Sequence, residues 1–148
     1  MKSEGESYSI DDLMRDGTTV WEGVRNYQAR NFMMRDMQVG DCVLFYHSNS
    51  APSGVYGTAV VSALAHPDLS QGNKKDTMHY DAKATKEKPI WYCVDVSFVL
   101  KFPHPVSLAE LKADHALLNM RVVQKASRLS VQPVSKAHFE HVCALGKK

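Results

Sequence analysis

The sequence predicts an α+β fold, in which a small mixed β-barrel is flanked by short helices. With 148 residues, the chain is long enough for one domain with a buried core. Strand-like segments alternate irregularly with short helical ones, so the regular βαβ order of a doubly wound sheet is not present. Because no internal repeat, low-complexity tract or linker interrupts the chain, we expect a single domain over residues 1–148.

The composition is that of an ordinary globular protein, and the charge argues against one class of function. Hydrophobic residues make up 44% of the chain, and the formal net charge is +2. So small a charge argues against an extended electrostatic grip on duplex but allows contact with a few phosphates. No apolar run approaches the ~20 residues of a membrane helix, and the polar N-terminus does not resemble a secretory signal. We expect no membrane partner and a cytoplasmic location, or a nuclear one in a eukaryote.

The first half of the chain is predicted to contain two helices and two strands. Ser9 is expected to cap a short helix that Gly17 ends. Residues 26–37 are expected to form the second helix. Residues 42–47 and 55–64 contain residue types that favour extended backbone, and each is expected to be a strand.

The middle of the chain combines its least regular segment with its clearest strand. Residues 66–88 are rich in Lys, Asp, Asn and Gly and contain few apolar anchors, which is typical of a long surface loop. Apolar side chains at every second position of residues 91–100 predict a strand. In that alternation Trp91 falls on the more polar face, away from the main core.

The last third is predicted to consist of short elements. The prolines within residues 102–105 are expected to end the preceding strand, and Ser107 begins a capping box for a short helix. Residues 114–120 are expected to add a helical turn, and residues 128–132 a short extended segment. A final helix is expected over residues 135–146.

Signatures of known enzymes and metal sites are missing from the sequence. There is no GxSxG, HExxH, GxxxxGK[ST] or GxGxxG motif. His138 and His141 have a spacing that can bind metal, but no third ligand accompanies them, so we expect neither metal nor cofactor. Cys42, Cys93 and Cys143 form no CxxC pair, and the first two are expected to be small core residues. We therefore expect a binding module without catalytic activity.

Eleven residues beginning at Trp21 carry the strongest functional signal. They hold two large aromatics, two arginines and two asparagines, with little apolar periodicity. Such side chains stack on planar rings, neutralise phosphate and pair with base edges. Each also has a structural alternative: Trp21 as a core or rim residue, Asn26 as a helix cap, and Arg25, Arg30 and Asn31 as buried braces of the fold.

Together with residues 1–4, 43–48 and 129–133, this stretch resembles the EVE domain, a PUA-like relative of the YTH readers of methylated bases. The similarity covers nearly the whole chain and includes the motifs WxGVRNYxARN and FYHS. It implies a PUA-like barrel that binds a modified base in DNA or RNA, flipped into an aromatic pocket. The candidate bases are methylated or hydroxymethylated cytosine and methylated adenine. Gly5 replaces a proline of the family, and the strand that usually precedes residues 1–4 is absent or cut short.

The resemblance also implies which residues form the site. The base-binding pocket is expected to consist of Trp21, Asn26, Tyr27, Tyr46, His47, Ser48, Trp91, Ser130, Val131 and Gln132. Phosphate contacts are expected from Lys2, Arg25, Arg30 and Arg128. Trp21 and Trp91 are expected to share one aromatic pocket, with a gain of ~1–3 kcal/mol for each base stacked on an aromatic ring. The domain is expected to be a monomer that acts beside a separate effector protein.

Several of these residues can instead have a purely structural role. His47 and Ser48 can satisfy backbone groups of the following loop, Trp91 can pack at the end of the barrel, and residues 129–133 can be an ordinary strand. A competing function is a small-ligand sensor or enzyme that uses the same pocket for a free nucleotide or metabolite. In that case Cys42, His47 or Asp95 are the candidate reactive groups.

Overall fold

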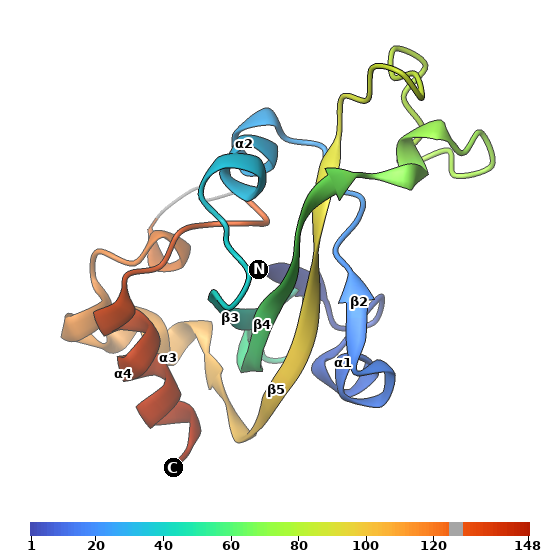
Figure 1. Cartoon of the computed structure of the whole chain (residues 1–148). Coiled ribbons are helices and arrows are strands. Elements are labelled where there is room, and N and C mark those ends of the chain that lie inside the picture. The colour runs from blue at the N-terminus through green and yellow to red at the C-terminus, as the bar shows by residue number, and fades with distance from the viewer. Residues whose placement is uncertain (125–128) are drawn as a thin grey trace.

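A curled five-stranded sheet forms the centre of the computed structural model, which describes residues 1–124 and 129–148 (Figure 1). The strands run in the spatial order β1-β3-β4-β5-β2. Their bounds are β1 Lys2–Glu4, β2 Thr18–Val20, β3 Cys42–Ser48, β4 Gly54–Pro67 and β5 Tyr92–Ser107. β1 pairs with β3 in parallel and the other pairs are antiparallel. The predicted α+β class is confirmed, as a half-barrel in which β1 and β2 are the two edges.

In the described part of the chain, four α-helices surround the sheet, and each begins at a polar cap. They are α1 Ile10–Asp16, α2 Tyr27–Arg35, α3 Leu108–Ala113 and α4 Lys136–Gly146, with 3₁₀ turns η1 Leu69–Gly72, η2 His115–Leu117 and η3 Arg121–Val123. The side chains of Ser9, Asn26, Ser107 and Ser135 each accept a hydrogen bond from a backbone N–H three residues later. The predicted helix starts are therefore confirmed to within one residue. Among residues 1–124 and 129–148, no helix is long and apolar enough to cross a membrane.

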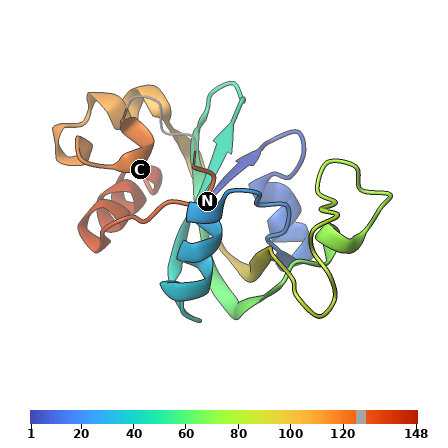
Figure 2. The same ribbon diagram turned by 90° about the horizontal axis from the view of Figure 1, so that it is seen from above.

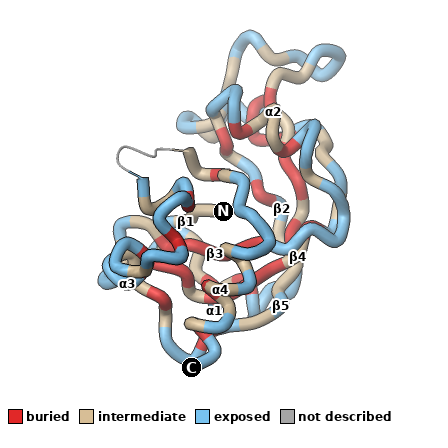
Figure 3. The backbone as a smooth tube through the Cα atoms, turned by 90° about the vertical axis from the view of Figure 1, so that its left-hand side faces the viewer, coloured by how far each residue is buried: buried red, intermediate tan, exposed pale blue. Residues whose placement is uncertain are grey.

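The sheet has a hydrophobic core on each face. β3 shows the division, since Val43 and Phe45 enter one core while Leu44 and Tyr46 enter the other. The first core includes buried residues of α1 and α2, and the second includes those of α3 and α4. Buried segments accordingly follow the strands through the middle of the molecule (Figure 3). Seen from above, α3 and α4 lie at one end, and the segment between β4 and β5 projects at the other (Figure 2).

The prolines after Leu100 do not end the strand, contrary to the sequence prediction. β5 continues through Pro103 and Pro105 to Ser107. Lys101 and Val106 both pair with β4, and the four residues between them have no partner in that register. Both prolines fall in this irregularity, where a missing N–H breaks no ladder hydrogen bond.

The burial of Trp91 and of two cysteines can be compared with the sequence predictions. Trp91 lies outside both hydrophobic cores, as predicted, and is nevertheless buried, with 6% of its surface exposed. Its indole N–H donates to Asp81 Oδ2 at 2.9 Å, so burial leaves the polar end of the ring satisfied. The prediction that Cys42 is a core residue was wrong, because it is exposed at the start of β3, whereas Cys93 is buried as expected.

The segment after β4 has polar anchors that its composition does not reveal. Asp68, Ser70 and Gln71 are buried, although the sequence predicts a surface loop with few anchors. The amide of Gln71 accepts hydrogen bonds from the backbone N–H groups of Ile90 and Trp91 and donates one to Trp91 O. The side chain of Gln71, at the beginning of this loop, thereby binds the backbone of Ile90 and Trp91 at its end, as a neighbouring strand would do.

Candidate functional site

A cavity of about 490 Å³ lies where the half-barrel leaves its two edge strands open. β1 contributes Lys2 and Ser3, and β2 contributes Thr19 and Val20. The other lining residues are Ser7, Tyr8, Trp21, Glu22, Gly23, Val24, Arg25, His79 and Ser130. This volume falls in the range of about 300–1,000 Å³ that is usual for sites binding small molecules or cofactors.

Trp21 serves the core and the cavity together. Its backbone N–H donates to Val94 O at 2.8 Å, which extends the pairing of β2 with β5 by one residue. Its ring meets that of Phe45 edge to face, with centroids 5.4 Å apart and planes at 88°. With 8% of its surface exposed, Trp21 presents a limited aromatic area to the cavity from a position fixed by the core.

A glycine allows the loop to form one wall of the cavity. Gly23 has φ of +86°, and a Cβ atom there would lie 2.8 Å from Nε2 of His79. A larger residue would therefore strain the backbone and displace the imidazole that lines the cavity. The Nδ1 atom of that imidazole is 2.8 Å from Asp76 Oδ2, which fixes the plane of the ring.

Arg25 and Asp68 connect this wall to the sheet. The guanidinium donates to Val24 O, Asp68 Oδ2 and Ser70 Oγ, and twice to His79 O, so all five of its N–H groups are used. Burial alone would raise the pKa of Asp68, but hydrogen bonds from Ser70, Gly23 and Arg25 outweigh it and lower the pKa. The structure thus shows the bracing role that the sequence left open for Arg25. For Arg25 to contact a phosphate, at least one of these internal hydrogen bonds must be replaced by a bond to the phosphate.

A second aromatic cluster meets the cavity at Arg25, which belongs to both. The ring of Tyr27 is 4.8 Å from that of Trp91, and the guanidinium groups of Arg25 and Arg30 lie over Trp91 at 5.4 and 5.9 Å. Arg30 also donates to Asn31 Oδ1 and Ile90 O. Trp91 does not line the cavity with Trp21, because Tyr27 and the two guanidinium groups cover its ring.

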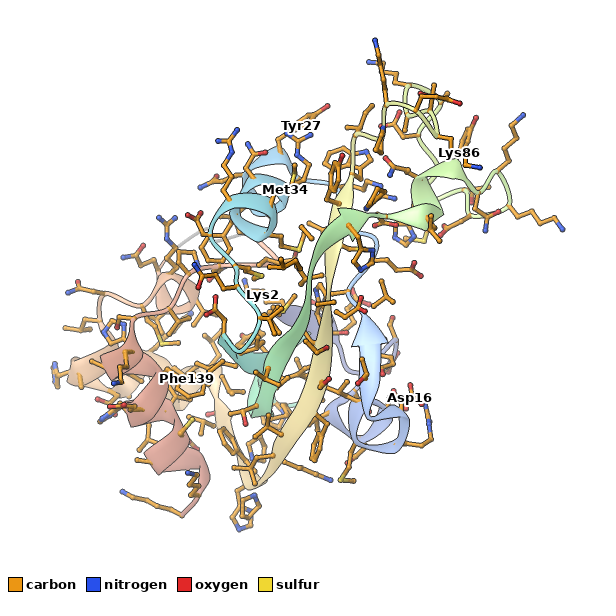
Figure 4. The ribbon with its side chains drawn as sticks, in the orientation of Figure 1. Lys2, Asp16, Tyr27, Met34, Lys86 and Phe139 are labelled. Carbon is orange, nitrogen blue, oxygen red and sulfur yellow. The ribbon has the colours of Figure 1, made fainter. Side chains whose placement is uncertain are left out.

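Tyr27 and Asn26 are exposed residues at the start of α2. Asn26 is the N-cap of this helix, and its Oδ1 accepts the N–H of Ala29 at 3.1 Å. Tyr27 is 58% exposed and points away from the sheet (Figure 4). The capping alternative therefore describes Asn26, and neither side chain lines the cavity.

The predicted residues of β3 are structural in this arrangement. Tyr46 belongs to the second core, with Lys2 Nζ 5.6 Å from the centre of its ring. His47 is buried, and its Nε2 accepts the N–H of Ile10 at 3.1 Å, which satisfies a donor in the first turn of α1. Burial lowers the pKa of His47. The hydroxyl of Ser48 donates to Ser3 O at 3.5 Å.

The segment before α4 contributes one predicted residue to the cavity. Ser130 lines it, and its carbonyl accepts the N–H of Lys2 at 2.7 Å. Val131 is buried in the first core, and Gln132 lines two other hollows. Arg128 lies outside the described residues. Of the predicted site residues, the structure brings together Trp21, Ser130, Lys2 and Arg25.

Two groups resemble catalytic or metal-binding arrangements. Cys93 Sγ lies 3.8 Å from His66 Nδ1, and His66 Nε2 lies 2.8 Å from Asp95 Oδ1. However, Cys93 is 1% exposed and burial raises the pKa of its thiol to about 12, so this sulfur is not an activated nucleophile. His141 pairs with Asp114 at 2.7 Å, and residues 1–124 and 129–148 hold no group of three potential metal ligands.

Comparison with known proteins shows close relatives over the full domain. The model of the EVE domain matches residues 1–145. Thymocyte nuclear protein 1 from Homo sapiens is 40% identical over 167 residues, covering 100% of this chain and 73% of the relative, and the Gallus gallus protein is 40% identical over 164 residues, covering 98% and 66%. The chain therefore spans about two thirds to three quarters of the length of these curated relatives.

Solved structures give the same result for the fold. The crystal structure of a Pseudomonas syringae protein is 43% identical, with a TM-score of 0.92 over 98% of this chain and 96% of that one. The crystal structure of human THYN1 protein in complex with 5-methylcytosine containing DNA is 40% identical, with a TM-score of 0.90 over 100% of this chain and 96% of that one.

Proposed function

This chain belongs to the EVE domain family, and on that premise we propose that it is a non-catalytic module that binds a modified base in nucleic acid. The base is held in the cavity beside Trp21. The observation that carries the proposal is the position of this cavity, between the two edge strands and walled by the aromatic Trp21 and the imidazole of His79. Modified DNA is the first ligand to test, because human THYN1 protein was crystallised with 5-methylcytosine containing DNA.

The free energy gained by stacking a base on Trp21 is similar in size to the cost of taking that base out of a duplex. Taking a base out of a duplex requires a few kcal/mol, and a base stacked on an aromatic ring gains ~1–3 kcal/mol. One methyl group adds about 0.8 kcal/mol when buried, which corresponds to a several-fold preference. Sharper discrimination requires hydrogen bonds, and the polar residues that line the cavity include Ser3, Thr19, Glu22 and Ser130.

Fluorescence anisotropy with short duplexes tests the proposal. The panel contains an unmodified duplex and duplexes that carry methylated cytosine, hydroxymethylated cytosine or methylated adenine, each measured at two salt concentrations. We expect one modification to bind more tightly than the unmodified duplex, with affinity falling as salt rises. Modified RNA of the same sequence distinguishes the two kinds of nucleic acid.

A pair of variants separates binding from stability. Trp21→Ala is expected to weaken binding at least tenfold, but it also removes the edge contact with Phe45. Met33→Ala is the matched control, since Met33 is fully buried in the same core and does not line the cavity. Equal losses of affinity in the two variants, or no preference for any modification, would refute the proposal. Tight binding of a free nucleoside with little salt dependence would instead support a small-ligand sensor.

A further inference from the structure

A tight turn in the loop after β4 carries an exposed methionine, Met78, next to a residue that lines the cavity. The N–H groups of His79 and Tyr80 both donate to Asp76 O, at 3.2 and 2.9 Å, which closes the turn around Met78. Met78 is 84% exposed, and the next residue, His79, lines the cavity. Exposure alone does not single out Met78, since Leu69 in the same loop is equally exposed; the distinguishing feature of Met78 is that it directly precedes a residue that lines the cavity.

The turn is held rigidly although its tip is exposed. Nε and Nη2 of Arg25 both donate to His79 O, at 3.0 and 2.8 Å, and the imidazole of His79 is anchored by Asp76. On the far side of the turn, Asp81 accepts the indole N–H of Trp91. The backbone that carries Met78 is therefore held in a set position relative to the cavity.

The charge around Met78 suits an approach to phosphate. The loop carries five exposed lysines, namely Lys74, Lys75, Lys83, Lys86 and Lys88. Lys86 extends outward at the end of the loop (Figure 4). Hydrogen bonds from His79 and Trp91 lower the pKa values of Asp76 and Asp81, so both stay ionised, and with Glu87 they leave residues 73–88 with a net charge of +2. An apolar side chain on a loop of net positive charge fits a DNA duplex, whose stacked bases lie between phosphate strands.

We propose that Met78 enters the base stack and fills the space that the modified base leaves when it moves into the cavity. The inference rests on the proposed function and names a residue for the extraction step. An empty space in a duplex exposes the neighbouring base pairs to water, and apolar side chains such as Leu, Ile and Met insert between base steps in proteins that distort DNA. The cavity holds the base, and the loop holds the duplex open.

Met78→Ala tests this role on two forms of the same ligand, a duplex and a single strand that each carry one 5-methylcytosine. A single strand has no stack to fill, so the variant should bind it as the unchanged protein does. On the duplex, we expect an affinity loss of about tenfold, the scale of burying one apolar side chain. Met78→Leu should restore most of the duplex affinity, because leucine also inserts between bases.

Leu69→Ala is the matched control, because Leu69 is also 84% exposed in this loop but lies in η1, before the turn in the sequence and not next to a residue that lines the cavity. It should leave both affinities unchanged. Duplex binding by Met78→Ala at the affinity of the unchanged protein would overturn the inference, as would an equal loss on duplex and single strand. If the unchanged protein shows no preference for the modified base in either form, the proposed function fails instead, so the two failures are distinguishable.

Discussion

Asp68 and Gly23 lie 45 positions apart in the sequence, and the N–H of Gly23 donates to the buried Oδ2 of Asp68 at 2.8 Å. The same carboxylate oxygen accepts a bond from Arg25 at 3.1 Å. One buried side chain thereby holds the segment after Trp21 against the loop that carries His79. The shape of the cavity depends on this link, since residues of both segments line it.

Asp68→Asn should destabilise the protein strongly. The substitution leaves the charge of Arg25 without its partner and turns an amide N–H₂ toward backbone or side-chain donors. Breaking a buried ion pair in this way usually lowers the free energy of unfolding by about 3–5 kcal/mol. Urea denaturation measures the change. Glu140→Gln is the control, because its pair with Lys136 is exposed and is worth less than about 1 kcal/mol. Similar effects of the two substitutions would contradict the role given to Asp68.

Gly23→Ala should weaken binding of modified DNA more than it weakens the fold. The new methyl group would press on the imidazole of His79 and move one wall of the cavity. Gly17→Ala provides the comparison, because Gly17 also has a positive φ, of +78°, but open space around it. Both changes carry a backbone strain of roughly 1–3 kcal/mol. Anisotropy titrations and thermal unfolding of both proteins separate strain from displacement, and equal affinities would show that His79 does not shape the site.

Acid should destabilise the fold through His47. Burial lowers the pKa of this imidazole below its ordinary value of 6.5, although Asp11 and Asp12 oppose the shift. The unfolded chain therefore binds a proton at a higher pH than the folded one does. Stability from neutral His47 is present above about pH 6.5 and is lost as the pH falls through and below that value. Protonation of Nε2 also removes the acceptor for the N–H of Ile10.

His47→Gln separates this contribution from those of the other histidines. The amide oxygen of glutamine can accept the same N–H but does not titrate. Free energies of unfolding from urea titrations, compared between neutral and mildly acidic pH, should fall less steeply for the variant. Parallel pH profiles of the two proteins would assign the acid sensitivity to other groups.

The three cysteines should differ sharply in reactivity. Cys42 is exposed, while burial raises the pKa of the Cys93 thiol to about 12 and also raises that of Cys143. Iodoacetamide at mildly alkaline pH, followed by mass spectrometry, should therefore modify Cys42 first and Cys93 only after unfolding. Rapid modification of Cys93 in the native protein would revive the enzyme alternative through the His66–Asp95 pair.

Local rules predicted the elements well and the burial of polar residues poorly. Ser9, Asn26, Ser107 and Ser135 start helices because their side chains bond to N–H groups only three residues away. The prolines of β5 misled the prediction, because their tolerance depends on which positions β4 leaves unpaired. The residues of β4 that decide this pairing lie far from the prolines in the sequence, so local patterns do not reveal it.

The candidate site shows the same division. The motif around Trp21 marked the segment that lines the cavity, together with Lys2 and Ser130. His79 and Asp68 were missed, since both lie in a polar segment that has the composition of any surface loop. Trp91 was assigned to the cavity because a tryptophan offers a stacking surface, but neighbouring side chains already cover its ring.

The sequence by itself determined the helix starts, most of the strands and the family, because these depend on neighbouring residues and on a recurring pattern of side chains. Only the tertiary structure decided which polar groups face the cavity and which brace the fold. Arg25 has the same chemistry in either role. Its five hydrogen bonds to Val24, Asp68, Ser70 and His79 exist because folding brings distant segments together and buries Asp68, and a buried carboxylate requires such partners.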